Sequence, residues 1–391
     1  MLCMKMDAFD KAFLDLKKEQ KQSPFNSFGL EYPLSTVPGL TTTDVFVNYA
    51  EPVQLISKHL FATLLNKDKN ERRQILLVGS AGAGKSTLLE YLFERSQDYE
   101  KHGKFKSSGM KDISIWMGAS AKALEQDDVE RRIGAMVVNQ ATGVFFLDDI
   151  QELLFSEKYF GKKIIEVYRK IDESLKAFEG LVISTVTPRF FEEMISQPEI
   201  FSFYHEVIFL DGISPEHMTE LIRKRLNALK LDPVQSNFDP FESGVLDCII
   251  EGSMKNPRLL LEMTDNCIIE AHRFEEKKIS LRACKQIVEK NSNLLKKIDE
   301  LTPTLKETLN NCAISALVST QDISRISKKE RNTISEHLNE LVRLGLLEKK
   351  PSEDKEKITY FILPTVVRTK VDLYYSDRAK DQFSLLKLKK F

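Results

Sequence analysis

The sequence predicts an α/β protein with a parallel sheet covered by helices, then a helical domain, then a small helix–strand domain. From about residue 46 to 210, short apolar runs alternate with segments of helical spacing. From 213 to about 295 only helical spacing continues, and from about 302 three helices precede two short β runs. Strands that alternate with helices favour right-handed crossovers and hence a parallel sheet.

The expected strands of the sheet are five apolar runs, at 74–78, 113–117, 144–147, 181–184 and 207–210. Short, continuous apolar runs are typical of strands buried on both faces. Helices are expected between them over 85–96, 124–139 and 162–177, and in the helical domain over 214–230, 242–252, 257–273 and 280–290. The expected domains are 1–45, 46–211, 212–296 and 297–391.

The first of these segments combines a short amphipathic helix over 7–22 with an arm rich in Pro, Gly, Ser and Thr. Phe9, Phe13 and Leu16 share one helical face. This helix either packs on the body of the protein or forms an arm for a partner or for self-association.

Composition excludes several classes of protein. The 391 residues are 42% hydrophobic and 29% charged with a net charge of −1, an ordinary globular balance. No apolar run approaches the ~20 residues that a membrane helix needs, and the N-terminus lacks the apolar core of a signal peptide. We therefore expect a cytoplasmic protein. The five cysteines lack metal-site spacing, so neither a zinc site nor a disulfide framework is expected.

A glycine-rich loop between the first strand and the next helix has the spacing G-x-x-x-x-G-K-[ST]. It comprises Gly79, Ser80, Ala81, Gly82, Ala83, Gly84, Lys85, Ser86 and Thr87. Its glycines let backbone N–H groups point at phosphate oxygens, and the helix N-terminus adds a positive dipole. We expect Lys85 to neutralise the β- and γ-phosphates and the Ser86 hydroxyl to bind Mg²⁺. The sequence thus predicts an ATP–Mg²⁺ site.

Polar side chains at two other strand ends complete this expectation. Asp148 and Asp149 follow the strand at 144–147, at the edge where parallel sheets bind ligands. We expect Asp148 to hold Mg²⁺ and Asp149 to orient or deprotonate the attacking water. Thr185, or alternatively Ser184, would position that water from the far side. Arg258, at the start of a helix, would reach back to the nucleotide.

These elements, in this order, resemble the AAA+ ATPases over residues 46 to 295. The segment KNPRLLL at 255–261 resembles the helical-lid motif of origin-recognition-type initiators and related archaeal ATPases. The resemblance implies that the loop is a Walker A motif, Asp148 and Asp149 a Walker B motif, Thr185 or Ser184 sensor 1, and Arg258 sensor 2.

Two departures from the AAA+ pattern bear on hydrolysis. The second Walker B acid is usually Glu, whereas Asp149 is one methylene shorter, so we expect slow hydrolysis. The segment 194–210 contains no Arg or Lys where an arginine finger is expected, and Arg189 is a weak substitute. The sequence therefore favours an ATP-gated switch over hydrolysis in trans.

The C-terminal domain resembles a winged helix-turn-helix, with helices over 304–314, 320–328 and 329–344 and a hairpin around the polar turn 351–357. The third helix of such a domain enters the DNA major groove. The candidate DNA contacts are Lys328, Lys329, Arg331, Asn332, Thr333, Ser335, Asn339 and Arg343. From Leu301 onward 17 Lys and Arg face 12 Asp and Glu, which favours a nucleic-acid partner. The mixed charges of the turn favour a protein contact instead.

The leading hypothesis is an ATPase in which ATP sets the angle of the winged helix, with an initiator-like role in replication on double-stranded DNA. Replication or regulatory proteins are possible further partners. One alternative is a target-selecting ATPase of a transposon. Another is a signalling or regulatory switch whose winged helix contacts protein. A metabolic kinase is disfavoured because it would leave the chain beyond residue 210 unexplained.

Overall fold

The computed structural model describes residues 23–35, 46–47, 49–65, 73–101, 113–118, 142–155, 166, 169, 173, 180–232, 239–351 and 359–389. The predicted helices over 7–22 and 124–139 and the wing turn at 352–358 lie outside these residues. Of the predicted helix over 162–177, only residues 166, 169 and 173 are described, and all three are helical. The described parts of Asn48–Ile213 and Asn293–Phe391 form one compact unit, and those of Met1–Val47 and Ser214–Ser292 form another.

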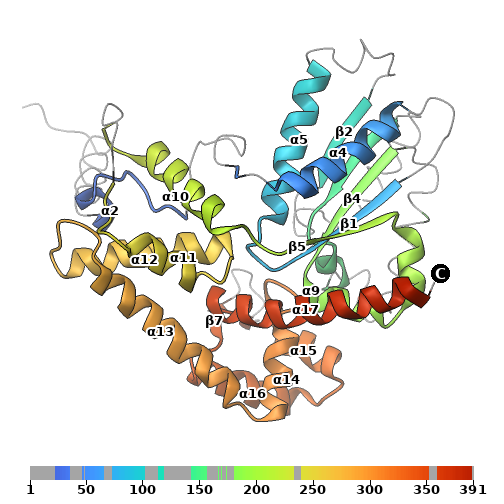
Figure 1. The fold of residues 1–391 in the computed structure, drawn as a ribbon. Coiled ribbons are helices and arrows are strands. Elements are labelled where there is room, and N and C mark those ends of the chain that lie inside the picture. Colours follow the sequence, from blue (N-terminus) through green and yellow to red (C-terminus); the bar gives the residue numbers. More distant parts are fainter. Residues whose placement is uncertain are drawn as a thin grey trace, which may run out of the picture. The chain divides into compact units, whose positions relative to one another are not determined.

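The first unit contains a five-stranded parallel sheet in the order β2-β3-β4-β1-β5 (Figure 1). Its strands are β1 (Arg73–Gly79), β2 (Ile113–Gly118), β3 (Thr142–Leu147), β4 (Gly180–Val186) and β5 (Glu206–Leu210). All five predicted strands are confirmed, with ends that differ by at most two residues. The central strand β4 and its neighbour β1 are almost wholly buried, as expected of a parallel sheet covered on both faces.

The register of the sheet brings the predicted site residues to one edge. Leu147 of β3 lies opposite Ser184 of β4, so Asp148 follows beside Thr185. Leu77 of β1 lies opposite Thr185, and two residues later the glycine-rich loop begins. Three strand ends therefore converge, and α5 (Lys85–Lys101) starts directly from the loop.

Four further elements around the sheet were not predicted. They are α4 (Ala50–Leu65), η1 (Ile150–Phe155), α9 (Pro188–Ile195) and η3 (Pro198–Phe203). Thr187 caps α9 by accepting a hydrogen bond from the Phe190 N–H, and Pro188 occupies the first turn, where its missing N–H costs nothing.

The C-terminal part of this unit has the element order of the predicted winged helix-turn-helix. Helices α14 (Pro303–Cys312), α15 (Thr320–Ser327) and α16 (Arg331–Arg343) accompany an antiparallel sheet of β6 (Val318–Ser319), β8 (Thr359–Ile362) and β7 (Glu348–Pro351). Ile334, Leu338 and Leu341 form the fully buried stripe of α16. We call residues 303–362 the C-terminal module.

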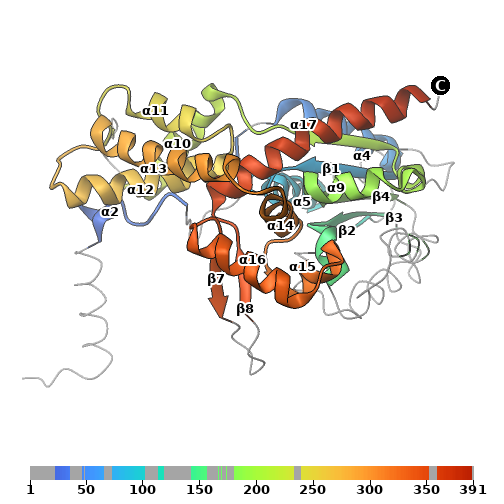
Figure 2. The same ribbon diagram turned by 90° about the horizontal axis from the view of Figure 1, so that it is seen from below.

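A long helix that the sequence analysis missed follows this module. This helix, α17, spans Thr365–Lys389. It lies alongside α9 (Figures 1 and 2). Phe383 of α17 packs in edge-on and tilted contacts against Phe191, Phe201 and Phe209 of the sheet domain. This aromatic cluster joins α17 to α9, η3 and β5, the elements around the five-stranded sheet.

The second unit is helical, as predicted, with α10 (Pro215–Leu229), α11 (Val245–Gly252), α12 (Pro257–Arg273) and the first part of α13 (Leu281–Asp299). Residues 23–35, expected as an extended arm, contain the short helix α2 (Pro24–Ser27). The buried carboxylate of Asp265 accepts hydrogen bonds from the Leu34 and Ser35 N–H groups at 2.6 and 2.9 Å. This part of the arm is therefore bound to its own helical unit.

None of the helices among the described residues has the length and apolar character needed to cross a bilayer.

Candidate nucleotide site

The glycine-rich loop has backbone angles that require glycine at two positions. Gly82 and Gly84 have φ values of 82° and 92°, in the left-handed region that side chains disfavour. A Cβ at Gly84 would also lie 3.0 Å from the Tyr49 hydroxyl oxygen. Tyr49 donates that hydroxyl proton to the Ala83 carbonyl. Tyr49 supports the loop from just before α4, and no sequence motif indicated it.

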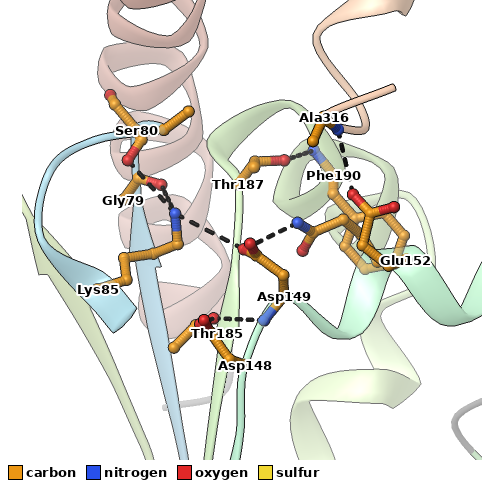
Figure 3. A network of polar contacts seen from close by, with 12 residues as sticks. Gly79, Ser80, Lys85, Asp148, Asp149, Glu152, Thr185, Thr187, Phe190 and Ala316 are labelled. Carbon is orange, nitrogen blue, oxygen red and sulfur yellow. Dashed lines mark hydrogen bonds and ion pairs between the residues drawn. The ribbon is translucent and has the colours of Figure 1, made fainter. Parts of the chain in front are cut away.

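Lys85 is buried at the start of α5, and its amine points back over the loop (Figure 3). Its Nζ donates to the carbonyl oxygens of Gly79 at 2.9 Å and Ser80 at 3.3 Å. It lies 3.9 Å from Oδ1 of Asp149. The Lys85 amine therefore lies between the glycine-rich loop and the Asp149 carboxylate, where it could contact the phosphates of a bound nucleotide.

Asp148, Asp149 and Thr185 form a hydrogen-bonded group at the ends of β3 and β4 (Figure 3). The Thr185 hydroxyl donates to Asp148 Oδ1 at 2.6 Å and accepts from the Asp149 N–H at 2.7 Å. Thr185 donates its hydroxyl proton to one acid and accepts a backbone proton from the next, so it positions both Asp148 and Asp149. Ser184 is its neighbour on the same strand and faces the opposite side of the sheet, so the geometry favours Thr185 over Ser184.

The two predicted magnesium ligands contact each other. The Ser86 hydroxyl is hydrogen-bonded to the Asp148 carboxylate. Burial and the neighbouring Asp149 charge raise the pKa of Asp148, while hydrogen bonds from Ser86 and Thr185 and the Lys85 charge lower it. Hydroxyl and carboxylate oxygens fit Mg²⁺, which proteins usually hold with one or two such groups beside substrate phosphates.

Asp149 has an unusual backbone conformation, with φ at 47°. Its Oδ1 accepts a hydrogen bond from Gln151 Nε2 at 3.0 Å, and its carbonyl accepts from the Glu152 N–H at 2.9 Å. A non-glycine residue in the left-handed region is uncommon and persists where its surroundings fix it. The turn holds the Asp149 carboxylate beside Lys85.

The two arginines considered as nucleotide contacts, Arg258 and Arg189, differ in their surroundings. Arg258 is exposed on the first turn of α12 in the helical unit, where the Asn256 side chain caps the helix by accepting from the Leu259 N–H. Its sensor-2 role stays a prediction. Arg189 is buried, pairs with Glu193 at 2.6 Å and donates to Asn311 at 3.1 Å. Arg189 is thus bound within its own chain, unlike a free arginine finger.

The C-terminal module touches the acidic strand end through a residue that the sequence did not indicate. Glu152 of η1 accepts hydrogen bonds from the Ser315 hydroxyl at 2.8 Å and from the Ala316 N–H at 3.1 Å (Figure 3). Burial raises the pKa of Glu152, and these hydrogen bonds lower it. Glu152 therefore links the segment that carries Asp148 and Asp149 to the turn between α14 and β6.

A second link runs through α17. Arg368, which is 7% exposed, donates to the carbonyl oxygens of Ser315 and Ala313, and its Nε lies 3.8 Å from Asp372 Oδ2. Asp372 in turn accepts a hydrogen bond from the Ala81 N–H in the glycine-rich loop at 2.8 Å. The loop and the C-terminal module are thus connected by two side chains of one helix.

The candidate DNA contacts lie on α16 and in the turn that precedes it, and some of them pair with acidic residues. Most are exposed, whereas Lys329 and Ser335 are half-buried. Lys329 pairs with Glu307 at 2.7 Å, and Arg343 pairs with Glu340 at 2.6 Å. Lys328 ends α15 in the left-handed conformation. Exposed ion pairs are weak, so these cations can exchange partners for phosphate.

No protein-family model matches the chain, and no curated protein matches its sequence. Solved structures match in fold. The Aeropyrum pernix ORC1 protein, solved in complex with DNA, is 13% identical with a TM-score of 0.51, over 87% of this chain and 95% of that one. The Aeropyrum pernix ORC2 protein, solved as ADPNP and ADP complexes, is 16% identical with a TM-score of 0.53, over 89% and 99%. The chain therefore shares its fold with these two ORC proteins, and the predicted α/β fold class is confirmed.

Proposed function

We propose that this protein is an ATP-binding AAA+ switch that hydrolyses ATP slowly and binds double-stranded DNA through its C-terminal module, in an initiator-like role. The observation that carries the proposal is the convergence of Lys85, Ser86, Asp148 and Asp149 on one sheet edge. Two proteins of the same fold were solved with nucleotides or with DNA, which supports the same ligands here.

Each residue of the site has a distinct task in this proposal. The loop N–H groups and Lys85 bind the phosphates, and Ser86 and Asp148 hold Mg²⁺, which neutralises charge on the transferred phosphoryl group. Asp149 orients the attacking water and accepts its proton, while Thr185 fixes both acids. Arg258 would contact the nucleotide from the helical unit.

The Asp149→Asn variant tests the hydrolytic part of the proposal. Asparagine preserves the size of the side chain and an acceptor for Gln151 but loses the basic carboxylate. We expect ATP turnover to fall by about 100-fold or more, with ATP affinity changed by less than about threefold. Phosphate release and calorimetric titration measure the two quantities. Asp377→Asn, an exposed acid on α17, serves as the control. Turnover equal to that of the wild type would contradict the assigned role.

The DNA-binding part is tested with two matched arginines. Arg343 on α16 and Arg273 on α12 are both about 70% exposed, and each pairs with a glutamate three residues earlier. We expect Arg343→Ala to weaken duplex binding about fivefold and to lower the salt dependence by about one counterion, and Arg273→Ala to change neither. Fluorescence anisotropy with and without ATP–Mg²⁺, at two salt concentrations, measures both effects. Equal binding by the two variants would exclude α16 as the contact.

The second candidate function is a nucleotide-gated switch whose C-terminal module contacts protein. The pairing of Lys329 and Arg343 with glutamates favours this alternative, because it offsets positive charge on α16 and on the turn before it. No duplex binding at low salt by a protein that binds ATP would select it.

A further inference from the structure

A carboxylate of the chain itself contacts the glycine-rich loop. Asp372, in the second turn of α17, is fully buried, and its Oδ2 accepts a hydrogen bond from the Ala81 N–H at 2.8 Å. The N–H groups of such a loop bind phosphate oxygens because they form a concave, positively polarised site. Asp372 therefore makes with Ala81 the kind of contact that a phosphate oxygen would make.

This contact is not explained by stability alone. The second oxygen of the carboxylate, Oδ1, is buried and accepts no hydrogen bond from the described residues. Burial raises the pKa of Asp372, while Arg368, the Ala81 N–H and Lys85 lower it. A buried carboxylate with one oxygen lacking a hydrogen bond is costly, and each such group in a folded protein needs an explanation.

The neighbours of Asp372 indicate which phosphate it would meet. Its carboxylate interacts electrostatically with Lys85 and with Asp149. In the proposed function, Lys85 contacts the β- and γ-phosphates and Asp149 lies beside the water that attacks the γ-phosphate. In that arrangement Asp372, through its contact with Ala81, would share its neighbours with the terminal phosphate of ATP. ADP carries no group at that position.

We propose that Asp372 is a specificity-determining residue of the nucleotide site. ADP binds while α17 stays in place, whereas ATP binds only when α17 is displaced from the glycine-rich loop. The inference rests on the proposed function, because it assumes that the loop binds nucleotide. The γ-phosphate and the carboxylate carry like charges and compete for one N–H group. Only Leu363 and Pro364 separate α17 from β8. A displacement of α17 by the γ-phosphate would therefore also move the strand β8 of the C-terminal module.

The Asp372→Asn variant tests the charge conflict without changing the size of the side chain. We expect ATP affinity to rise about tenfold, a typical size for coupling between two ligands, and ADP affinity to change by less than about threefold. Calorimetric titrations with ATP–Mg²⁺ and ADP–Mg²⁺ give both constants. Asp377→Asn removes an exposed charge from the same helix and is expected to change neither. Thermal melting verifies that both variants are folded.

A measurement on the wild-type protein needs no variant. Amide hydrogen exchange of residues 365–375 is expected to be faster with the non-hydrolysable analogue ADPNP than with ADP, because only the former displaces α17. An unchanged ratio of ATP to ADP affinity in Asp372→Asn, or equal exchange with both nucleotides, would overturn the inference and leave the proposed function standing. Absence of nucleotide binding by both wild type and variant would reject the two together.

Discussion

Replacing Lys85 by alanine is expected to lower nucleotide affinity by at least about 100-fold. The buried amine is held over the loop by the carbonyl oxygens of Gly79 and Ser80, so its position is fixed before a ligand arrives. Each charge-assisted hydrogen bond to a phosphate contributes about 1.5–3 kcal/mol, and two such bonds correspond to roughly 100-fold or more. Titration of the variant with ATP–Mg²⁺ and with ADP–Mg²⁺ measures the loss.

The control is Lys101→Ala, which removes an exposed lysine from the opposite end of the same helix. We expect it to bind nucleotide as the wild type does. Because the Lys85 amine also faces Asp149 at 3.9 Å, the melting temperature of each variant is recorded alongside. Nucleotide affinity of a folded Lys85→Ala variant within about threefold of the wild type would show that the glycine-rich loop is not the phosphate site.

The core of this site could be predicted because it follows from local rules. Four or five apolar residues followed by a polar group identify a buried parallel strand and its carboxyl end, and these ends share one edge of a sheet. The glycine spacing of the loop and the positions of Asp148 and Thr185 needed no other information. The left-handed backbone of Gly82 and Gly84 agrees with the residue type at those positions.

The helix α17 was missed although its sequence carries a signal. Val367, Val371, Tyr375, Ala379 and Phe383 recur every four residues, and all five are buried. The helix starts, however, two residues after the strand β8, with the β-branched residues Thr365, Val366 and Val367. Such residues favour strands, so the start of the helix resembles a continuation of the hairpin.

The residues that surround the predicted site could not be inferred from local patterns. Glu152 and Ser315 are 163 positions apart, and Ala81 and Asp372 are 291 apart. A single acidic residue in a helix normally indicates a solvated face. Only the packing of α17 and the α14–β6 turn beside the sheet edge gives Glu152 and Asp372 their roles.

These long-range contacts make the site acidic. Asp148, Asp149, Glu152 and Asp372 gather around Lys85 and Arg368. Burial is the main factor that raises the pKa of Asp148, Glu152 and Asp372. Like charges packed together repel and need compensation. Lys85 compensates on the side of the glycine-rich loop and Arg368 on the side of the C-terminal module. The two cations are therefore the groups whose loss should have the largest consequences.

Replacing Arg368 by alanine is expected to lower the free energy of unfolding by about 3–5 kcal/mol. The guanidinium is buried, donates to the carbonyl oxygens of Ala313 and Ser315, and lies beside the Asp372 carboxylate. Its removal leaves two buried carbonyl oxygens without a donor and the buried Asp372 charge without a partner. Removing one member of a buried ion pair is strongly destabilising for this reason. For a unit of this size the loss corresponds to a fall in melting temperature of the order of 10 °C.

The control lies on the same helix. The Arg378 side chain is 50% exposed and pairs with Glu192 at 2.8 Å, an ion pair expected to contribute less than about 1 kcal/mol. Arg378→Ala should therefore melt within about 2–4 °C of the wild type. A double variant, Arg368→Met with Asp372→Asn, removes both buried charges and should recover part of the loss, because the remaining carboxylate is what makes the single change costly. Melting of Arg368→Ala at the temperature of Arg378→Ala would show that Arg368 does not hold α17 to the C-terminal module.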